Sequence, residues 1–487
     1  MDRNNSSACR PFLIWALPLF LVWGCHAASH RPYQVVRSDR LVPIELPKVE
    51  RVKLPNGMYL LLIEDHELPL IHLAGMVRTG SIYDPPEKVG LAEITAQVMR
   101  TGGTSKMTGD QVDAFLDRRA ASIEIGMDLT AGQIAASALR EDFNDVLSVL
   151  ADILMSPALS QDKIDLAKMQ HRSAIARRND DPGQIGQREF AKLIYGPDSV
   201  YARHTEYQTI DNITRDDLVQ FHRRFFGPNT TYMAVWGDFQ TAQMVKLIER
   251  VFADWRPLEA DLPGPPPVEY QYKSTVNLIT KQDINQSTII LGHIGGRMDD
   301  PEYPVLTVME TILGSGFTSR LFREVRSRQG LAYSVRGRYG CGFHHPGLFM
   351  VACQTQSGKT VHAIRAMQRE VERITESMVT QEELATAKEA FLNAFVLNYE
   401  SIGQIAQRLL AYEYYGYPPD FLERLRDGVE QVTRGQVLKV ARQYLRPQAM
   451  QILVVGRPED FDQDLAVLGP VNHIDVTIPE PSEQAGR

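Results

Sequence analysis

The sequence predicts an α+β fold made of two homologous domains in tandem, each a largely antiparallel sheet with helices packed on one face. An internal repeat is the main reason. Residues 212–239 and 431–461 resemble one another at a constant offset of 219, so that Thr214 corresponds to Thr433. Each copy has apolar residues at the helical period, a proline that ends the helix, and an alternating strand that ends in glycine.

A second similarity lies earlier in each half. "IHLAGMVRTGSIYDPPEKVGLAEI" and "IILGHIGGRMDDPEYPVLTVMETI" both have a strand, an Asp-Pro turn and an apolar helix. Several strands come early in each half, as hairpins, and the helices follow. The expected strands are "GMYLLLIED", "IHLAGMVR" and "TAGQIAASALR" in the first half, and "TVNLITKQ", "STIILGHIG", "YSVRGRYG" and "GLFMVACQTQ" in the second. Grouped strands favour an antiparallel sheet with helices on one face. The repeat of about 210 residues is far too long for a solenoid.

The junction between the halves is rich in proline. The stretch "LEADLPGPPPVEYQ" carries four prolines around a glycine, which predicts a stiff, extended linker. The expected division of the chain is a signal peptide (1–24), a flexible leader (25–47), an N-terminal domain (48–257), a linker (258–271), a C-terminal domain (272–475) and a flexible tail (476–487).

The N-terminus predicts export. Arg3 and Arg10 precede an apolar run over 11–23, which is too short to span a membrane and fits the hydrophobic part of a signal peptide. "LVWGC" also resembles a bacterial lipobox, in which Cys25 would be lipidated and become the first mature residue. Ordinary cleavage near Ala27 or Ala28 is the alternative. We therefore expect a periplasmic protein, whose membrane contact, if any, is an N-terminal lipid anchor.

Charge and cysteine content narrow the function further. The chain is 44% hydrophobic and carries a net charge of −8 without any Lys/Arg block, which argues against nucleic-acid binding. Beyond the N-terminal segment only Cys341 and Cys353 remain. An oxidising compartment permits a disulfide between them, and two free thiols are the alternative.

The sequence resembles the pitrilysin/insulinase family of zinc peptidases over about residues 50–470. The first half carries "NGMYLLLIEDHELPLIHLAGMVRTGS", "GLA…MRTGGTS" and "VWGDF", and the second half carries "LGSGFTSRLFREVRSRQGLAYSV" at 313–335. The resemblance implies that the two domains of one chain together form one half of a clam-shell. It also implies a zinc-binding His-x-x-Glu-His helix after Gly-Leu-Ala, where two histidines one turn apart hold the metal and the glutamate acts as general base.

This helix lacks the residues that the family's chemistry needs. The first histidine falls on Glu93, the glutamate on Ala96 and the second histidine on Gln97. The family's further glutamate ligand falls at about Ser173 or Ala174. A single carboxylate and an amide do not hold zinc, so we expect no metal site in this chain.

A relocated zinc site is not apparent either. None of the histidines begins His-x-x-Glu-His or His-Glu-x-x-His. His344 and His345 are adjacent in an expected hairpin turn, where neighbouring side chains point apart, and His171 has no obvious companion. These are expected to be ordinary surface or capping histidines.

The second half keeps the residues that the family uses to bind substrate. A Gly-rich loop (Gly314, Ser315 and Gly316) and the sequence "SRLF" precede Arg326 and Tyr333, which are seven residues apart. The resemblance implies that the tyrosine hydroxyl reaches the scissile carbonyl and that the arginine holds a neighbouring substrate carbonyl. Without the resemblance, an arginine on a solvated helix face and a packed tyrosine would be the simpler interpretation.

Three functions follow from this combination. The first is a non-catalytic, substrate-positioning subunit of an exported heterodimeric zinc peptidase, whose homologous partner carries zinc and the sheet edge that holds the peptide substrate. The second is a scaffold or peptide-binding protein of the same fold. The third is an autonomous metal-dependent peptidase with a rebuilt site, which requires zinc in the isolated chain.

Overall fold

The computed structural model describes residues 47–259 and 262–479 of the chain. The expected signal peptide, the leader up to residue 46 and Cys25 lie outside these ranges and are not tested. Within the described ranges no helix is both long and apolar enough to cross a membrane.

The first half of the chain forms one sheet. Its strand order is β1-β2-β6-β3-β5-β4, and every neighbouring pair is antiparallel except β2 with β6. The strands are β1 (Glu50–Lys53), β2 (Tyr59–Glu64), β3 (Leu70–Val77), β4 (Ser122–Met127), β5 (Gly132–Leu139) and β6 (Thr231–Gly237).

The second half forms another sheet with the order β13-β7-β12-β8-β11-β10-β9. Its strands are β7 (Thr275–Thr280), β8 (Gln286–Ile294), β9 (Gly296–Arg297), β10 (Ala332–Gly342), β11 (Pro346–Gln356), β12 (Gln451–Gly456) and β13 (Val471–His473). The central order β7-β12-β8-β11-β10 repeats the order β2-β6-β3-β5-β4 of the first sheet. The predicted duplication of an α+β unit is therefore confirmed.

One expectation about strand pairing was wrong. The early strands do not all form hairpins, because β6 lies between β2 and β3, and β12 lies between β7 and β8. These last strands are buried and apolar, and each pairs along both of its edges. The β4–β5 and β10–β11 pairs are hairpins, as the local sequence predicts.

Helices account for most of the remaining chain. The first half contributes α1 (Leu91–Thr101), α2 (Gly109–Asp117), α3 (Phe143–Met155), α4 (Gln161–Arg177), α5 (Pro182–Tyr195), α6 (Tyr207–Asp211), α7 (Arg215–Phe225) and α8 (Thr241–Val251). The second half contributes α9 (Tyr303–Leu313), α10 (Thr360–Glu376), α11 (Gln381–Val396), α12 (Ile402–Tyr415), α13 (Phe421–Gln431) and α14 (Arg434–Tyr444). The apolar sides of most of these helices pack with their own half's sheet into two large cores.

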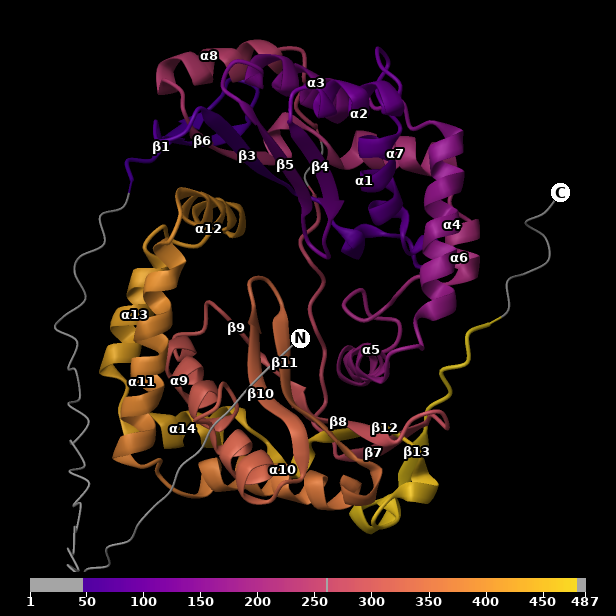
Figure 1. Cartoon of the computed structure of the whole chain (residues 1–487), viewed down its shortest axis with the longest axis vertical. Coiled ribbons are helices and arrows are strands. Elements are labelled where there is room, and N and C mark those ends of the chain that lie inside the picture. The colour runs from indigo at the N-terminus through magenta and orange to yellow at the C-terminus, as the bar shows by residue number, and fades with distance from the viewer. Residues whose placement is uncertain (1–46, 260–261, 480–487) are drawn as a thin grey trace, which may run out of the picture. The chain divides into compact units, whose positions relative to one another are not determined.

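Two helices are exchanged between the halves. Helix α5 belongs to the first half in sequence but packs on β8 and β12 of the second sheet (Figure 1). Helix α12 belongs to the second half and packs on β6 and β3 of the first sheet. Their buried side chains form two further apolar cores. Each sheet thus has its own helices on one face and one helix from the other half on the opposite face.

A sequence repeat accounts for this exchange and was missed in the analysis of the sequence. The start of α5 reads "GQIGQREFAKLIYG" from Gly183, and α12 reads "GQIAQRLLAYEYYG" from Gly403. Ile185 and Ile405 occupy the same place in the two copies, and both are buried against the other half's sheet. Burial of one such side chain contributes roughly 1.5–3 kcal/mol. The two exchanged helices, α5 and α12, therefore hold the two halves of the chain together.

The two remaining cysteines are too far apart for a disulfide. Cys341 lies opposite Pro346 in the β10–β11 ladder, whereas Cys353 lies opposite Val335. Six residues of strand separate these rungs, which is about 20 Å, and a disulfide needs Cα atoms less than about 7 Å apart. Both thiols are free, so the second of the two alternatives holds.

Candidate functional site

Helix α1 begins as the family resemblance implies, with a glycine and a buried cap. Gly90 adopts a left-handed conformation with φ of 106°, which favours glycine. The Asp84 carboxylate accepts hydrogen bonds from the backbone N–H groups of Gly90 at 2.8 Å and Ala92 at 2.9 Å. A carboxylate at this position accepts hydrogen bonds from N–H groups that the helix leaves free. It also interacts favourably with the positive, N-terminal end of the helix dipole.

The positions that would hold zinc in the family carry a different contact. Gln97 donates its side-chain N–H to the Gln170 side-chain oxygen of α4. One turn away, Glu93 Oε2 lies 4.0 Å from His171 Nδ1. Ala96 is buried and offers no donor atom. Burial lowers the pKa of His171, which disfavours its charged form. Helices α1 and α4 are therefore joined by an amide contact at the place where the family's ligands would meet.

The downstream position adds no ligand. Ser173 donates its hydroxyl to the carbonyl of Met169 within α4, and Ala174 has no polar side-chain atom. Across the described residues, no group of three or more His, Cys, Asp or Glu side chains is placed to hold a metal ion. Residues present in the former site do not fit zinc.

The adjacent histidines point apart, as expected for neighbouring residues in a turn. The His345 ring stacks on Tyr201 at 4.4 Å between centroids, and His344 contacts Tyr415 edge-on at 4.9 Å. They therefore do not converge on one ion.

The Gly-rich loop of the second half packs directly on β10. Gly314 lies so close to Gly337 that a Cβ on Gly314 would come within 2.3 Å of the Gly337 Cα. The Gly314 carbonyl accepts a hydrogen bond from the Gly337 N–H at 3.1 Å. Gly316 adopts a positive φ of 83° in the same loop. Two glycines face each other because the backbones could not approach so closely otherwise.

Arg326 lies on a π-helical segment, η4 (Phe322–Arg328), where the sequence predicts an ordinary helix. A π-helical turn is rare and is often found at functional sites. The Arg326 guanidinium lies 4.6 Å from the centre of the Phe322 ring and 5.7 Å from that of Tyr333. Two aromatic rings therefore orient this cation.

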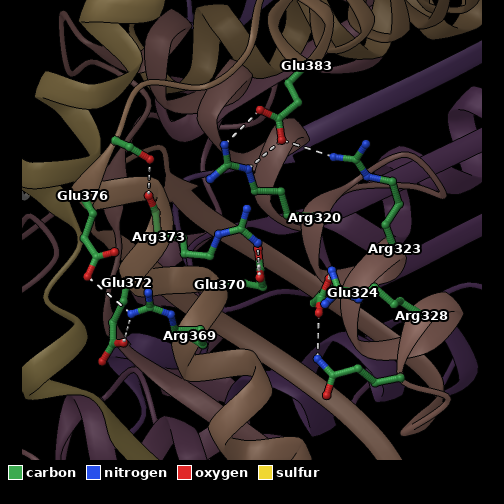
Figure 2. A network of polar contacts seen from close by, with 12 residues as sticks. Arg320, Arg323, Glu324, Arg328, Arg369, Glu370, Glu372, Arg373, Glu376 and Glu383 are labelled. Atoms are coloured by element: carbon green, nitrogen blue, oxygen red, sulfur yellow. Dashed lines mark hydrogen bonds and ion pairs between the residues drawn. The ribbon is translucent and has the colours of Figure 1, made fainter.

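The "SRLF" sequence fixes this segment in place. Arg320 is buried and donates two hydrogen bonds, at 2.7 and 2.9 Å, to the Glu383 carboxylate at the start of α11 (Figure 2). Arg323 adds a third, at 3.2 Å. Ser319 donates its hydroxyl to the Gly316 carbonyl, and Leu321 is fully buried. These residues hold the segment that carries Arg326.

The Arg320–Glu383 pair predicts an acid-sensitive contribution to stability. Burial alone would raise the pKa of Glu383, but hydrogen bonds from Arg320 and the Thr380 N–H, with the charges of Arg320 and Arg323, lower it from 4.5 to about 2. A folded-state pKa below the unfolded value stabilises the protein above the unfolded pKa, and this contribution is lost as the pH falls from about 4.5 to about 2. Urea unfolding of the wild type is expected to lose more stability over this range than that of Glu383→Gln. Equal losses in the two proteins contradict the prediction.

Tyr333 is exposed and does not pack in the core. The β10–β11 register shifts between Ala332 and Ser334, so Tyr333 sits in a β-bulge, which turns the side chain out of the regular alternation. Its side chain is 81% exposed. Its hydroxyl and the Arg326 guanidinium make no hydrogen bond to any described residue. The interpretation of Tyr333 as a packing residue is therefore wrong.

Arg326 lines a cavity of about 690 Å³ between α5 and η4. Its floor is the exposed face of β10 and β11, including Arg336 and Arg338, and Phe317 and Phe322 stand at its side. Phe317 is 77% exposed and packs edge-on against Phe322. Arg336, Arg338 and Phe317 were not predicted as site residues from the sequence, although "SVRGR" has its arginines at alternate positions of a strand.

The arrangement offers groups that can bind and orient a polar chain. Two unpaired donors, the Tyr333 hydroxyl and the Arg326 guanidinium, lie beside exposed aromatic side chains. The cavity lining, which consists only of described residues, includes no carboxylate or histidine. It therefore offers hydrogen-bond donors and positive charge, with no general base.

Two family models match the chain. Residues 59–195 match the model described as insulinase (peptidase family M16), and residues 212–391 match the one described as peptidase M16 inactive domain. Helix α1 lies in the first match, and both Arg326 and Tyr333 lie in the second.

Individual proteins agree with these matches. The chain is 25% identical to an uncharacterised zinc protease of Streptomyces coelicolor over 443 residues, which cover 88% of this chain and 94% of that protein. It is also 25% identical, over 381 residues, to the non-peptidase homologue YmxG of Helicobacter pylori, covering 77% of this chain and 86% of the relative. A solved peptidase M16 inactive domain from Pseudomonas fluorescens shares the fold, with a TM-score of 0.76 at 23% identity over 84% of this chain and 98% of that one.

Proposed function

The chain belongs to the M16 (insulinase) family of peptidases, and on this basis we propose that it is a substrate-positioning subunit of an exported heterodimeric zinc peptidase. In this proposal the chain hydrolyses nothing alone. A homologous subunit supplies zinc and the general base on an intact His-x-x-Glu-His helix. The substrate is a peptide or an unfolded polypeptide.

One observation carries the proposal: the chain lacks the metal-binding residues on α1 and keeps two neighbouring free donors in the other half, of which Arg326 lines the cavity and Tyr333 is exposed next to it in the chain fold. The exposed Tyr333 hydroxyl and the half-buried Arg326 guanidinium make no hydrogen bond to a described residue, and both gain hydrogen bonds when a ligand arrives. In an assembled site, the Tyr333 hydroxyl would donate to the oxyanion that forms at the scissile carbonyl. Arg326 would hold a neighbouring carbonyl and fix the register of the peptide.

The expected export and lipidation belong to the same proposal. They rest on the apolar run and the lipobox-like sequence around Cys25, which lie outside the described residues. Export would bring both subunits into one compartment.

Isolation of the complex tests the proposal. The chain is tagged at its C-terminus, extracted gently from the cell envelope and analysed by mass spectrometry together with its zinc content. We expect a stoichiometric M16 partner with an intact His-x-x-Glu-His helix and about one zinc ion per heterodimer, since one such site binds one ion. The isolated chain serves as the control and is expected to hold none.

A scaffold or peptide-binding protein is the second candidate. The similarity to the Helicobacter pylori YmxG protein, a non-peptidase homologue, favours it. Recovery of the chain without an M16 partner and without zinc supports this candidate against the heterodimer. Zinc bound to the isolated chain contradicts both and supports an autonomous peptidase.

A further inference from the structure

The floor of the second-half cavity differs in charge from the equivalent surface of the first half. The two sheets can be superposed rung by rung, because Ala234 in β6 and Leu453 in β12 are equivalent by the 219-residue offset. The equivalent rungs are Ala234, Ala74, Ala135 and Glu124 in the first sheet, and Leu453, Ile290, Ala352 and Arg336 in the second.

Arg336 therefore takes the place of Glu124. Two residues further along the strand, Arg338 lies opposite Met350. The residue of the first sheet that is equivalent to Arg338 is Gly126, which lies opposite Gln133. The first-half cavity, of about 590 Å³, contains Glu124 and no arginine or lysine in its lining of described residues. The duplicated surface has thus become basic in one copy only.

Arg336 and Arg338 project from the same face of β10. Both are exposed, while Gly337 between them is buried. Alternate residues of a strand lie about 7 Å apart on one face. Arg326 lines the same cavity from the side. Three guanidinium groups therefore point into one groove.

These charges are not neutralised by the described residues. None of the three arginines has a carboxylate within ion-pair distance, whereas the neighbouring carboxylates are engaged elsewhere. Glu189 on α5 pairs with Arg188 at 2.8 Å and Lys192 at 3.1 Å. Glu324 pairs with Arg328 at 3.3 Å (Figure 2). Glu310 accepts the Tyr339 N–H at 3.1 Å at the edge of β10; it feels the charge of Arg338 but makes no ion pair with it.

The edge of β10 is not free to accept another strand here. The Gly337 N–H is bonded to the Gly314 carbonyl, and the Tyr339 N–H is bonded to Glu310. A ligand in this groove must therefore be recognised by the side chains on its floor. Guanidinium groups at alternate strand positions match carboxylates at alternate positions of an extended peptide.

We propose that the groove between α5 and η4 selects acidic peptide segments, with Arg336 and Arg338 binding side-chain carboxylates spaced two residues apart. This specificity rests on the proposed function, in which Arg326 holds the backbone of the same peptide. It assigns Arg336 and Arg338 the role of specificity residues that act at a distance from the scissile bond.

Binding to the full isolated chain tests this specificity without requiring a peptidase partner. The probes are short fluorescein-labelled peptides with Glu, Gln or Lys at every second position, measured by fluorescence anisotropy. The Glu peptide is expected to bind about 10-fold more tightly than the Gln peptide, an effect that falls with ionic strength. Arg336→Gln/Arg338→Gln should abolish this preference. Arg118→Gln/Arg365→Gln, which removes two exposed arginines elsewhere, should keep it.

A charge reversal protects the test against simple loss of folding. Arg336→Glu/Arg338→Glu is expected to prefer the Lys peptide over the Glu peptide. The inference is overturned by equal binding of the Glu and Gln peptides, by no binding of any peptide, or by an oligothymidylate that binds as tightly as the Glu peptide. If the isolated chain prefers the Glu peptide but no M16 partner is found in the cell, the specificity proposed for the groove stands. Only the heterodimer proposal is then overturned.

Discussion

Replacing Tyr333 by phenylalanine is expected to lower kcat/KM of the proposed heterodimer, once reconstituted, by about 10²–10³-fold, the usual effect of removing one donor to an oxyanion. The loss should fall mainly on kcat, since the hydroxyl is needed in the transition state. Its position in the bulge and its 81% exposure leave the fold independent of the hydroxyl. Assembly with the partner should therefore be unchanged, as measured by size-exclusion chromatography.

Arg326→Ala and Tyr272→Phe complete this experiment. Arg326→Ala removes a group that would bind the substrate backbone, so KM should rise more than in Tyr333→Phe. Tyr272 is also exposed, at 48%, but lies away from this cavity beside His293 and Arg446. Tyr272→Phe is therefore expected to keep the activity of the complex. Full activity of both Tyr333→Phe and Arg326→Ala in the complex means that the pair is structural, and the heterodimer proposal loses its main support.

Arg320→Leu is expected to lower the free energy of unfolding by about 3–5 kcal/mol, because it leaves the Glu383 carboxylate without its main partner. The side chains of this pair are only 7% and 12% exposed. The change should also release η4 and move Arg326. Urea unfolding measures the first effect, and peptide binding to the folded variant measures the second.

Figure 2 also shows Arg369, whose substitution serves as the matched control. Arg369 pairs with Glu372 at 3.4 Å on the exposed side of α10, and its side chain is 59% exposed. Arg369→Leu is expected to cost less than about 1 kcal/mol, as is usual for exposed ion pairs. In a double-mutant cycle, Arg320→Leu/Glu383→Leu should cost less than the sum of the single changes. Equal effects of Arg320→Leu and Arg369→Leu contradict the anchoring role.

Much of the fold could be predicted from the sequence because it depends on local patterns. The duplication is visible in the helix–proline–strand repeat around Thr214 and Thr433, and the predicted strands form. The pairing of β6 between β2 and β3 could not be predicted, since it joins segments more than 150 residues apart. The register of long-range pairs depends on which apolar faces meet in the finished sheet.

The sequence by itself determined which site residues of the family are missing from this chain and which are kept. Zinc chemistry needs particular side chains at a fixed helical spacing, so their replacement by Glu93, Ala96 and Gln97 can be read directly. The seven-residue spacing of Arg326 and Tyr333 can be read in the same way.

Only the tertiary structure decided how the kept residues are presented. The bulge at Tyr333 and the π-helical turn at Arg326 appear only in the folded chain, and the exchange of α5 and α12 arises from contacts between distant segments. The same is true of the groove that brings Arg336 and Arg338 to the side of Arg326. The alternation along a strand predicts which residues share a face. Whether that face is covered or left open depends on segments from elsewhere in the chain.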